Sequence, residues 1–173
     1  MERESGGILT TRTAGRNRGY SPGVARLRTK AMVWVVRPGG DGRAEVLLLQ
    51  RSDQRGGGFH PVTGKAEPGE SALDAAAREA QEETGLAGPL ADLRFQHEFA
   101  RAGRRFVEHA FLLSASPGAQ VTLSGEHVAA DWVAPAEAVP RLRWTAHKAS
   151  LVLALAAWEL RPEAAAPTTV EGA

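Results

Sequence analysis

Two short apolar runs open the patterned part of the chain. Residues 31–36 and 46–49 are rich in β-branched and aliphatic side chains, and residues 37–44 between them include Pro-Gly-Gly-Asp-Gly. Apolar runs separated by a glycine- and proline-rich segment are typical of strands joined in a β-hairpin. We therefore expect a hairpin over residues 31–49.

The same pattern recurs in the second half of the chain. Residues 93–100 and 106–113 flank Ala102-Gly103-Arg104, and this spacing predicts a second hairpin. Residues 128–133 form another short apolar run, for which we expect one further strand.

Two longer segments have helical periodicity. Residues 73–84 are rich in alanine and glutamate, and residues 144–160 place Leu151, Leu155 and Trp158 on one stripe of a 3.6-residue helix. Strands and helices therefore interleave along the chain. This order predicts an α/β fold with a mixed sheet and helices packed on it.

The two ends of the chain lack such patterns. Residues 1–25 are rich in Gly, Arg, Ser and Thr, and residues 162–173 are mostly Ala, Pro and Thr. Such composition is typical of disordered segments, so we expect a disordered basic tail over 1–25 and a flexible end over 162–173. An alternative for the tail is contact of its arginines with a polyanion or a partner subunit. The domain itself is expected over residues 26–161.

Composition narrows the class of protein. The chain has 173 residues, 43% of them hydrophobic, which suits one domain with its own core. Its net charge is +1, so nothing favours specific nucleic-acid binding. There is no cysteine, which excludes disulfides and thiolate chemistry and fits a cytoplasmic location. No apolar stretch is long enough to span a bilayer, so we expect no membrane association.

One segment matches a spaced pattern that periodicity alone does not require. Residues 64–86 read GKAEPGESALDAAAREAQEETGL, and we call them the box. They fit G-x5-E-x7-R-E-U-x-E-E-x-G-U, where U is apolar. The positions fixed in identity are Gly64, Glu70, Arg78, Glu79, Glu82, Glu83 and Gly85. A chance match at seven fixed positions is on the order of 10⁻⁸ per window, so the pattern is specific.

The box also has the features of a complete short helix. Ser71, with Asp74 three positions later, is a capping-box-like start, and Gly85 suits the left-handed residue that ends a helix. We expect one side of this helix to pack on a sheet. The residues of that side are Leu73, Ala76, Ala77, Ala80 and Thr84. The three glutamates of the pattern are expected on the opposite, exposed face.

Three carboxylates on one helix repel one another and favour a bound cation. Glu79, Glu82 and Glu83 are spaced i, i+3, i+4, and their oxygens are the ligands that Mg²⁺ prefers. We therefore expect Mg²⁺ as cofactor, with Mn²⁺ as a substitute ion. The alternative is a solvated acidic helix face, but the matched Gly64 and Arg78 favour the metal site. The preceding loop, which begins at Gly64, can bring backbone groups and the helix N-terminus near a phosphate.

The box resembles that of the Nudix hydrolase superfamily. This resemblance implies a Nudix-type α/β/α sandwich and hydrolysis of nucleoside diphosphates linked to another moiety. Outside the box, from about residue 28 to 158, the chain is similar to the dihydroneopterin triphosphate pyrophosphohydrolases. The segments that carry this similarity are VLLLQR at 46–51, FHPVTG at 59–64, GEH at 125–127, Trp132 and Trp144.

The resemblance assigns roles to the metal-site residues. It implies metal ligation by Glu79, Glu83 and the remote Glu126, to which the helix pattern adds Glu82. Glu126 lies in a polar loop just before a predicted strand, and an ordinary loop glutamate is the alternative. The resemblance further implies that Arg78 pairs with Glu70 and orients the ligands.

Substrate contacts follow from the same resemblance. Arg28, Arg51 and Thr63 match substrate-contacting positions, and Arg51 can pair with phosphate. A solvated strand end is the alternative for Arg51. Trp144 is a candidate to stack on a base or pterin, with core packing as the alternative. We expect His127 to be a local hydrogen-bonding residue.

The expected reaction is hydrolysis of a phosphoanhydride by water. A nucleoside-triphosphate-like substrate, dihydroneopterin triphosphate or a (d)NTP, would give a monophosphate and pyrophosphate. Glu82 is the candidate base and Glu79 its competitor. The alternative substrates are dinucleoside polyphosphates and ADP-ribose-like compounds. A non-catalytic Nudix-fold ligand sensor is the alternative from another class.

Overall fold

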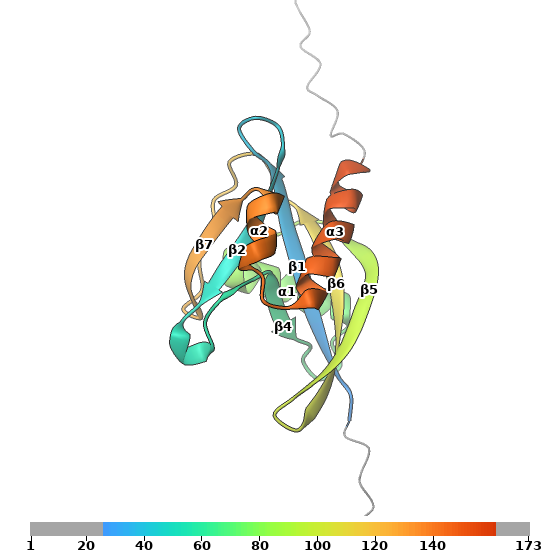
Figure 1. Cartoon of the computed structure of the whole chain (residues 1–173). Coiled ribbons are helices and arrows are strands. Elements are labelled where there is room, and N and C mark those ends of the chain that lie inside the picture. Colours follow the sequence, from blue (N-terminus) through green and yellow to red (C-terminus); the bar gives the residue numbers. More distant parts are fainter. Residues whose placement is uncertain (1–25, 162–173) are drawn as a thin grey trace, which may run out of the picture.

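A seven-stranded mixed sheet forms the centre of the computed structural model, which describes residues 26–161 (Figure 1). The strands are β1 (Arg28–Pro38), β2 (Ala44–Arg51), β3 (Phe59–His60), β4 (Val62–Lys65), β5 (Leu90–Arg101), β6 (Arg104–Ser114) and β7 (His127–Val133). Their order is β3-β2-β1-β6-β5, with β4 paired to β1 and β7 paired to β2. The β1–β6 pair is parallel and the other pairs are antiparallel.

Helices cover both faces of this sheet. Helix α1 (Ala72–Thr84) packs on one face, and α2 (Pro135–Arg141) and α3 (Thr145–Glu159) pack on the other (Figure 1). A single 3₁₀ turn, η1 (Asp53–Arg55), follows β2. The expected α/β/α sandwich with a mixed sheet is therefore confirmed. No helix within residues 26–161 is long and apolar enough to cross a membrane.

Alternation along β1 divides the core into two layers. Met32, Trp34 and Val36 face α2 and α3, whereas the side chains between them face α1. A strand that is covered on both faces needs apolar residues at successive positions, which is why residues 31–36 form one unbroken run. The indole Nε1 of Trp34 donates to Ser150 Oγ on α3 at 2.9 Å and ties that helix to the sheet.

Both predicted hairpins, the strand near residue 128 and the two long helices are confirmed. On α3, Leu151 and Trp158 are buried and Leu155 is partly buried against the same core, as the stripe predicted. The short α2 was not predicted, because its seven residues contain Pro135 and Pro140, which mark turns more often than helices. Our predictions for residues 1–25 and 162–173 lie outside the described residues.

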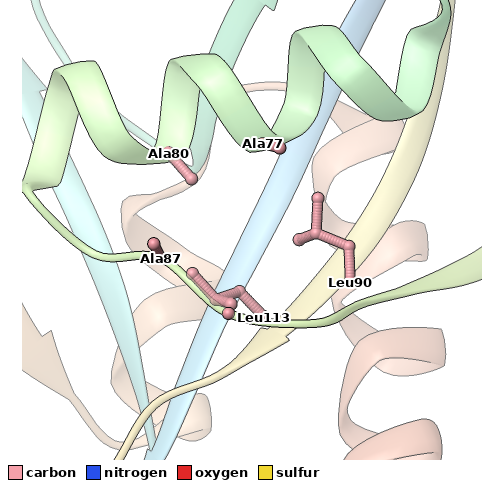
Figure 2. A pocket seen from close by; sticks show the side chains of 6 residues that line it. Ala77, Ala80, Ala87, Leu90 and Leu113 are labelled. Atoms are coloured by element: carbon pink, nitrogen blue, oxygen red, sulfur yellow. The ribbon is translucent and has the colours of Figure 1, made fainter.

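A small cavity lies between α1 and the β5–β6 hairpin (Figure 2). Its volume is about 80 Å³, and its lining consists of Ala77, Ala80, Ala87, Gly88, Leu90 and Leu113. A drug-sized ligand needs a pocket of about 300 Å³ or more. The lining is also apolar, so we interpret the cavity as a packing gap behind α1 rather than as a substrate site.

Candidate active site

The ends of α1 are fixed by its own sequence. Ser71 Oγ accepts a hydrogen bond from the backbone N–H of Asp74 at 3.1 Å, which caps the first turn. Gly85 adopts a left-handed conformation with φ of 72° and ends the helix. The predicted helix and both caps are confirmed. Its last two turns carry the three glutamates of the box, of which Glu79 and Glu83 lie against β4.

The three glutamates do not share one exposed face, so that prediction is wrong. Glu83 is only 4% exposed and lies on the stripe that contains Ala76 and Ala80, which packs on the sheet. Leu73 and Ala77, which we expected to pack there, are exposed. The buried stripe is rotated from the predicted one, since Ala75 and Glu83 are buried in place of Leu73 and Ala77. The backbone N–H of Thr63 on β4 donates to the Glu83 carboxylate, and this hydrogen bond accommodates the carboxylate on the buried side of the helix.

Glu79 and Gly64 lie in direct contact. A Cβ atom added to Gly64 would lie 1.7 Å from Cδ of Glu79, so only glycine leaves room for the carboxylate at this position of β4. The side chain of Glu79 is 15% exposed, whereas that of Glu82 is 59% exposed. The structure thus brings Glu79 and Glu83 to β4 and leaves Glu82 at the surface.

Arg78 links the box carboxylates. Its Nε and Nη2 donate to the two oxygens of Glu70 at 2.9 and 3.0 Å, a bidentate pair. Its Nη1 donates to Glu79 at 2.9 Å and to Glu82 at 3.2 Å. The hydrogen bonds from Arg78, and then the one from the backbone N–H of Glu67, lower the pKa of Glu70. Arg78 therefore holds the start of the box helix and two of its carboxylates in one network.

Glu83 occupies a buried, negatively charged setting. Its pKa is raised to about 8, chiefly by burial, and further by the charges of Glu79 and Glu126. The backbone N–H of Thr63 donates to its Oε2 at 3.3 Å, and this contact and the charge of Arg51 oppose the rise. A buried carboxylate beside two others is stabilised by a positive charge at the same place.

The loop before β7 is attached to the end of α1. The backbone N–H of Thr122 donates to the carbonyl of Thr84 at 2.8 Å, and that of Ser124 to the carbonyl of Glu83 at 3.4 Å. These bonds bring Glu126 near enough for its charge to raise the pKa of Glu83. Glu126 itself is exposed.

Two histidines lie beside Glu83. His127 is buried, with its Nε2 3.8 Å from Glu83 Oε1, and its ring centroid is 5.1 Å from that of His60. Burial and the charge of Arg51 lower the pKa of His60 to about 3, so its ring is neutral. Sequence analysis assigned no role to His60. No motif marks His60 in the sequence, where it stands between Phe59 and Pro61.

The predicted substrate contacts divide into two groups. Arg51 Nη2 donates to Thr63 Oγ1 at 3.1 Å, so these two residues lie together beside Glu83 and next to Gly64. Trp144 is 55% exposed at the start of α3, with the guanidinium of Arg143 4.9 Å from its ring, so core packing of Trp144 is excluded. Arg28 is exposed at the start of β1.

The carboxylates of the box are of the type that binds a cation, but their oxygens do not converge on one point. Within residues 26–161, no three His, Asp or Glu side chains converge closely enough to hold a metal ion as they stand. Arg78 engages Glu79 and Glu82 instead. Burial and the charges of Glu79 and Glu126 nevertheless raise the pKa of Glu83, so added positive charge there would stabilise its ionised form.

Replacing Gly64 tests this arrangement. In Gly64→Ala the new methyl group displaces the Glu79 carboxylate, whose end is mobile enough to move without unfolding the strand. We expect turnover to fall by at least about tenfold, since a displacement near 1 Å costs up to about 10²-fold. Steady-state hydrolysis of a nucleoside triphosphate measures the effect. Gly40→Ala is the matched control, because nothing lies within 4 Å of a Cβ there; equal turnover in the two variants would contradict the assignment.

A family model described as the NUDIX domain matches residues 26–155. The chain therefore belongs to the NUDIX family, and its fold and box are those of a Nudix hydrolase. Enzymes of this family generally use divalent metal ions.

Solved structures agree with this assignment. An Ap4A hydrolase from C. elegans, in a binary complex, is 23% identical with a TM-score of 0.68, over 77% of this chain and 98% of that one. The dihydroneopterin triphosphate pyrophosphohydrolase from E. coli is 27% identical with a TM-score of 0.60, over 71% of this chain and 91% of that one. The fold of this chain is thus shared by Nudix hydrolases that carry different names.

A curated relative carries a different name. An octanoyltransferase from Myxococcus xanthus is 44% identical over 103 residues, which are 57% of this chain. The matched part is only 29% of that protein, so its name describes a much longer chain.

Proposed function

We propose that this chain is a Mg²⁺-dependent pyrophosphohydrolase. It hydrolyses a nucleoside-triphosphate-like substrate, dihydroneopterin triphosphate or a (d)NTP, to a monophosphate and pyrophosphate. The observation that carries the proposal is the meeting of Glu79 and Glu83 with β4, beside Arg51 and Thr63. The carboxylates that would hold the metal ion therefore lie beside the guanidinium of Arg51, which would bind phosphate.

The proposed role of each site residue follows from its position. Glu79, Glu83 and Glu126 would hold the cation, with Glu82 next to them. A divalent ion bound there neutralises phosphate charge and makes a water more acidic. Arg51 is proposed to pair with phosphate oxygens, and the backbone at Gly64 to approach them closely.

Glu82 is our proposed base. Its side chain is 59% exposed, so it reaches water, and Arg78 Nη1 holds it at 3.2 Å. It would take a proton from the attacking water as oxygen bonds to phosphorus and the phosphoanhydride breaks. Glu79 is the competitor, since its carboxylate lies nearer β4. Arg78 and Glu70 would act by positioning these carboxylates.

A substrate panel tests the function. The purified chain is incubated with Mg²⁺ and dihydroneopterin triphosphate, each common (d)NTP, diadenosine tetraphosphate or ADP-ribose, and phosphate and pyrophosphate release are measured. We expect pyrophosphate release from a triphosphate. Preference for diadenosine tetraphosphate would instead favour the second candidate, which the likeness to an Ap4A hydrolase supports. Binding without turnover of any compound would favour a ligand sensor and overturn the proposal.

Glu126→Gln tests the remote ligand. If Glu126 holds the cation, the variant needs more Mg²⁺ for half-maximal rate and turns over more slowly, while KM for substrate changes less. The reason is that Glu126 lies near Glu83 but on another element. Turnover is measured against Mg²⁺ concentration for both proteins. An ordinary surface substitution changes stability by less than about 0.5 kcal/mol and the rate not at all, so superimposable curves would remove Glu126 from the site.

A further inference from the structure

A polar cluster lies on the face of the sheet that α3 covers. Lys30 on β1, Glu108 on β6 and His97 on β5 are direct neighbours in register across three strands. Lys30 Nζ donates to Glu108 Oε1 at 2.7 Å, and the Glu108 side chain is only 3% exposed. A buried ion pair gains little stability over apolar residues of the same volume, so its presence calls for another explanation.

Two histidines of this cluster have unused hydrogen-bonding capacity. His97 Nε2 lies 3.7 Å from Glu108 Oε2, a separation longer than a hydrogen bond. His147, on the first turn of α3, is 7% exposed and near enough to feel the charges of Glu108, Lys30 and His97. The Nδ1 atoms of both rings are buried and have no hydrogen-bond partner among residues 26–161. Unpaired buried polar atoms destabilise a protein unless something binds them.

Aromatic rings continue from this cluster along the sheet. The ring of His97 stacks on Phe99 at 5.3 Å, and Phe99 stacks on Phe106 at 5.3 Å. Lys30 and His97 keep 16% and 26% of their side chains exposed, so the cluster reaches the surface. A planar ring of a ligand bound here would therefore contact aromatic side chains on one side and charged side chains at its edge.

The cluster adjoins the hydrolytic site. Thr63 pairs with Met32, and Lys30 lies two positions from Met32 along β1. The side chains of Thr63 and Lys30 therefore both lie on the face of the sheet that α3 covers. Arg51, which contacts Thr63, is also near enough for its charge to act on His147. A substrate with its phosphates at Arg51 would therefore have Lys30 and Glu108 within the same face of the sheet.

We propose that Lys30, Glu108, His97 and His147 bind the organic group of the substrate and select a ring with a 2-amino-4-oxopyrimidine edge. This edge occurs in guanine and in pterins. The inference rests on the proposed function, and it adds the substrate class. Glu108 would accept from the ring N–H and the amino group, Lys30 would donate to the carbonyl oxygen, and the histidines would contact the ring nitrogens. Adenine presents no carbonyl oxygen to Lys30 and no ring N–H to Glu108.

Binding without turnover tests the inference. GMP, AMP, guanosine and neopterin are titrated into the whole chain in excess chelator, and the dissociation constants are measured by NMR. We expect GMP to bind at least about tenfold more tightly than AMP, since hydrogen bonds to charged groups are strong. Neopterin separates the two sources of the edge: binding tighter than that of guanosine points to pterins, and weaker binding points to guanine nucleotides.

Glu108→Gln should abolish the preference for GMP over AMP. Glu98→Gln is the matched control, because Glu98 lies on β5 in an exposed pair with Arg105, and it should keep the preference. Equal affinity of the wild type for GMP and AMP, or an unchanged preference in Glu108→Gln, would overturn the inference. Because no hydrolysis is needed, failure of the substrate panel is a separate result.

His147→Phe covers the case in which Glu108→Gln does not fold. It keeps a ring and removes the unpaired Nδ1, so the melting temperature should stay the same or rise. GMP binding should nevertheless weaken by at least about fivefold, a loss that a purely structural role would not cause. Unchanged GMP affinity in a folded His147→Phe protein would overturn the inference.

Discussion

Glu83→Gln is expected to lower turnover by at least about 100-fold, the loss typical of removing a charge-stabilising group. Glutamine keeps the shape of the side chain and its contact with the backbone N–H of Thr63. It removes one negative charge from the most buried carboxylate of the box. Turnover at saturating Mg²⁺ measures the effect, with Glu98→Gln as control. Near-normal turnover in a folded Glu83→Gln protein would contradict the role of Glu83.

The same variant has an opposite effect on stability without metal. The pKa of Glu83 is about 8 in the folded protein and 4.5 in its ordinary state, chiefly because of burial. Between these values the folded state retains a proton that the unfolded state has released, so the free energy of unfolding of the wild type falls as pH rises. Glutamine does not titrate. In thermal unfolding in chelator, the stability of Glu83→Gln relative to the wild type should therefore increase from pH 4.5 to about 8. A stability difference that does not change with pH would contradict this.

Much of the fold was predictable because its signals are local. The β1–β2 hairpin has unbroken apolar runs and the β5–β6 hairpin has mixed apolar and polar positions, in each case on either side of a glycine-containing turn. Helix α1 has its own caps at Ser71 and Gly85. Each of these features acts within a few residues, so the sequence pattern carries it.

The orientation of the box carboxylates was not predictable in the same way. Periodicity places Glu79, Glu82 and Glu83 on the helix but does not say which side meets the sheet. That side is decided by the contact of Glu79 with Gly64 and by the donation from Thr63 to Glu83, both across 15 residues or more. Periodicity alone therefore placed the buried Glu83 at the surface.

The cluster around Glu108 was missed for a related reason. Lys30 and Glu108 are separated by 78 residues and meet only because β1 and β6 are parallel neighbours. Parallel pairing joins strands through long connections that leave no turn signal in the sequence. The isolated His97 and His147 consequently carried no pattern, although the structure places them with Glu108.

Removing divalent cations is expected to abolish hydrolysis, and adding Mg²⁺ back should restore it. The basis is that Glu83 is buried among carboxylates whose charges raise its pKa, while Arg78 already engages Glu79 and Glu82. Phosphate oxygens brought to Arg51 would add further negative charge beside them. Without a cation this arrangement is electrostatically unfavourable, so substrate and carboxylates repel each other.

The measurement compares pyrophosphate release in excess chelator, after addition of Mg²⁺, and after addition of Mn²⁺. The melting temperature is recorded in the same samples, because a ligand that binds only the folded state raises it. Mg²⁺ should raise the melting temperature of the wild type and raise it less in Glu83→Gln. Hydrolysis that persists in excess chelator would contradict the proposed metal-dependent mechanism. A Mg²⁺ shift of equal size in both proteins would place the cation elsewhere, because Glu83 is the proposed ligand on the buried side of α1, in contact with β4.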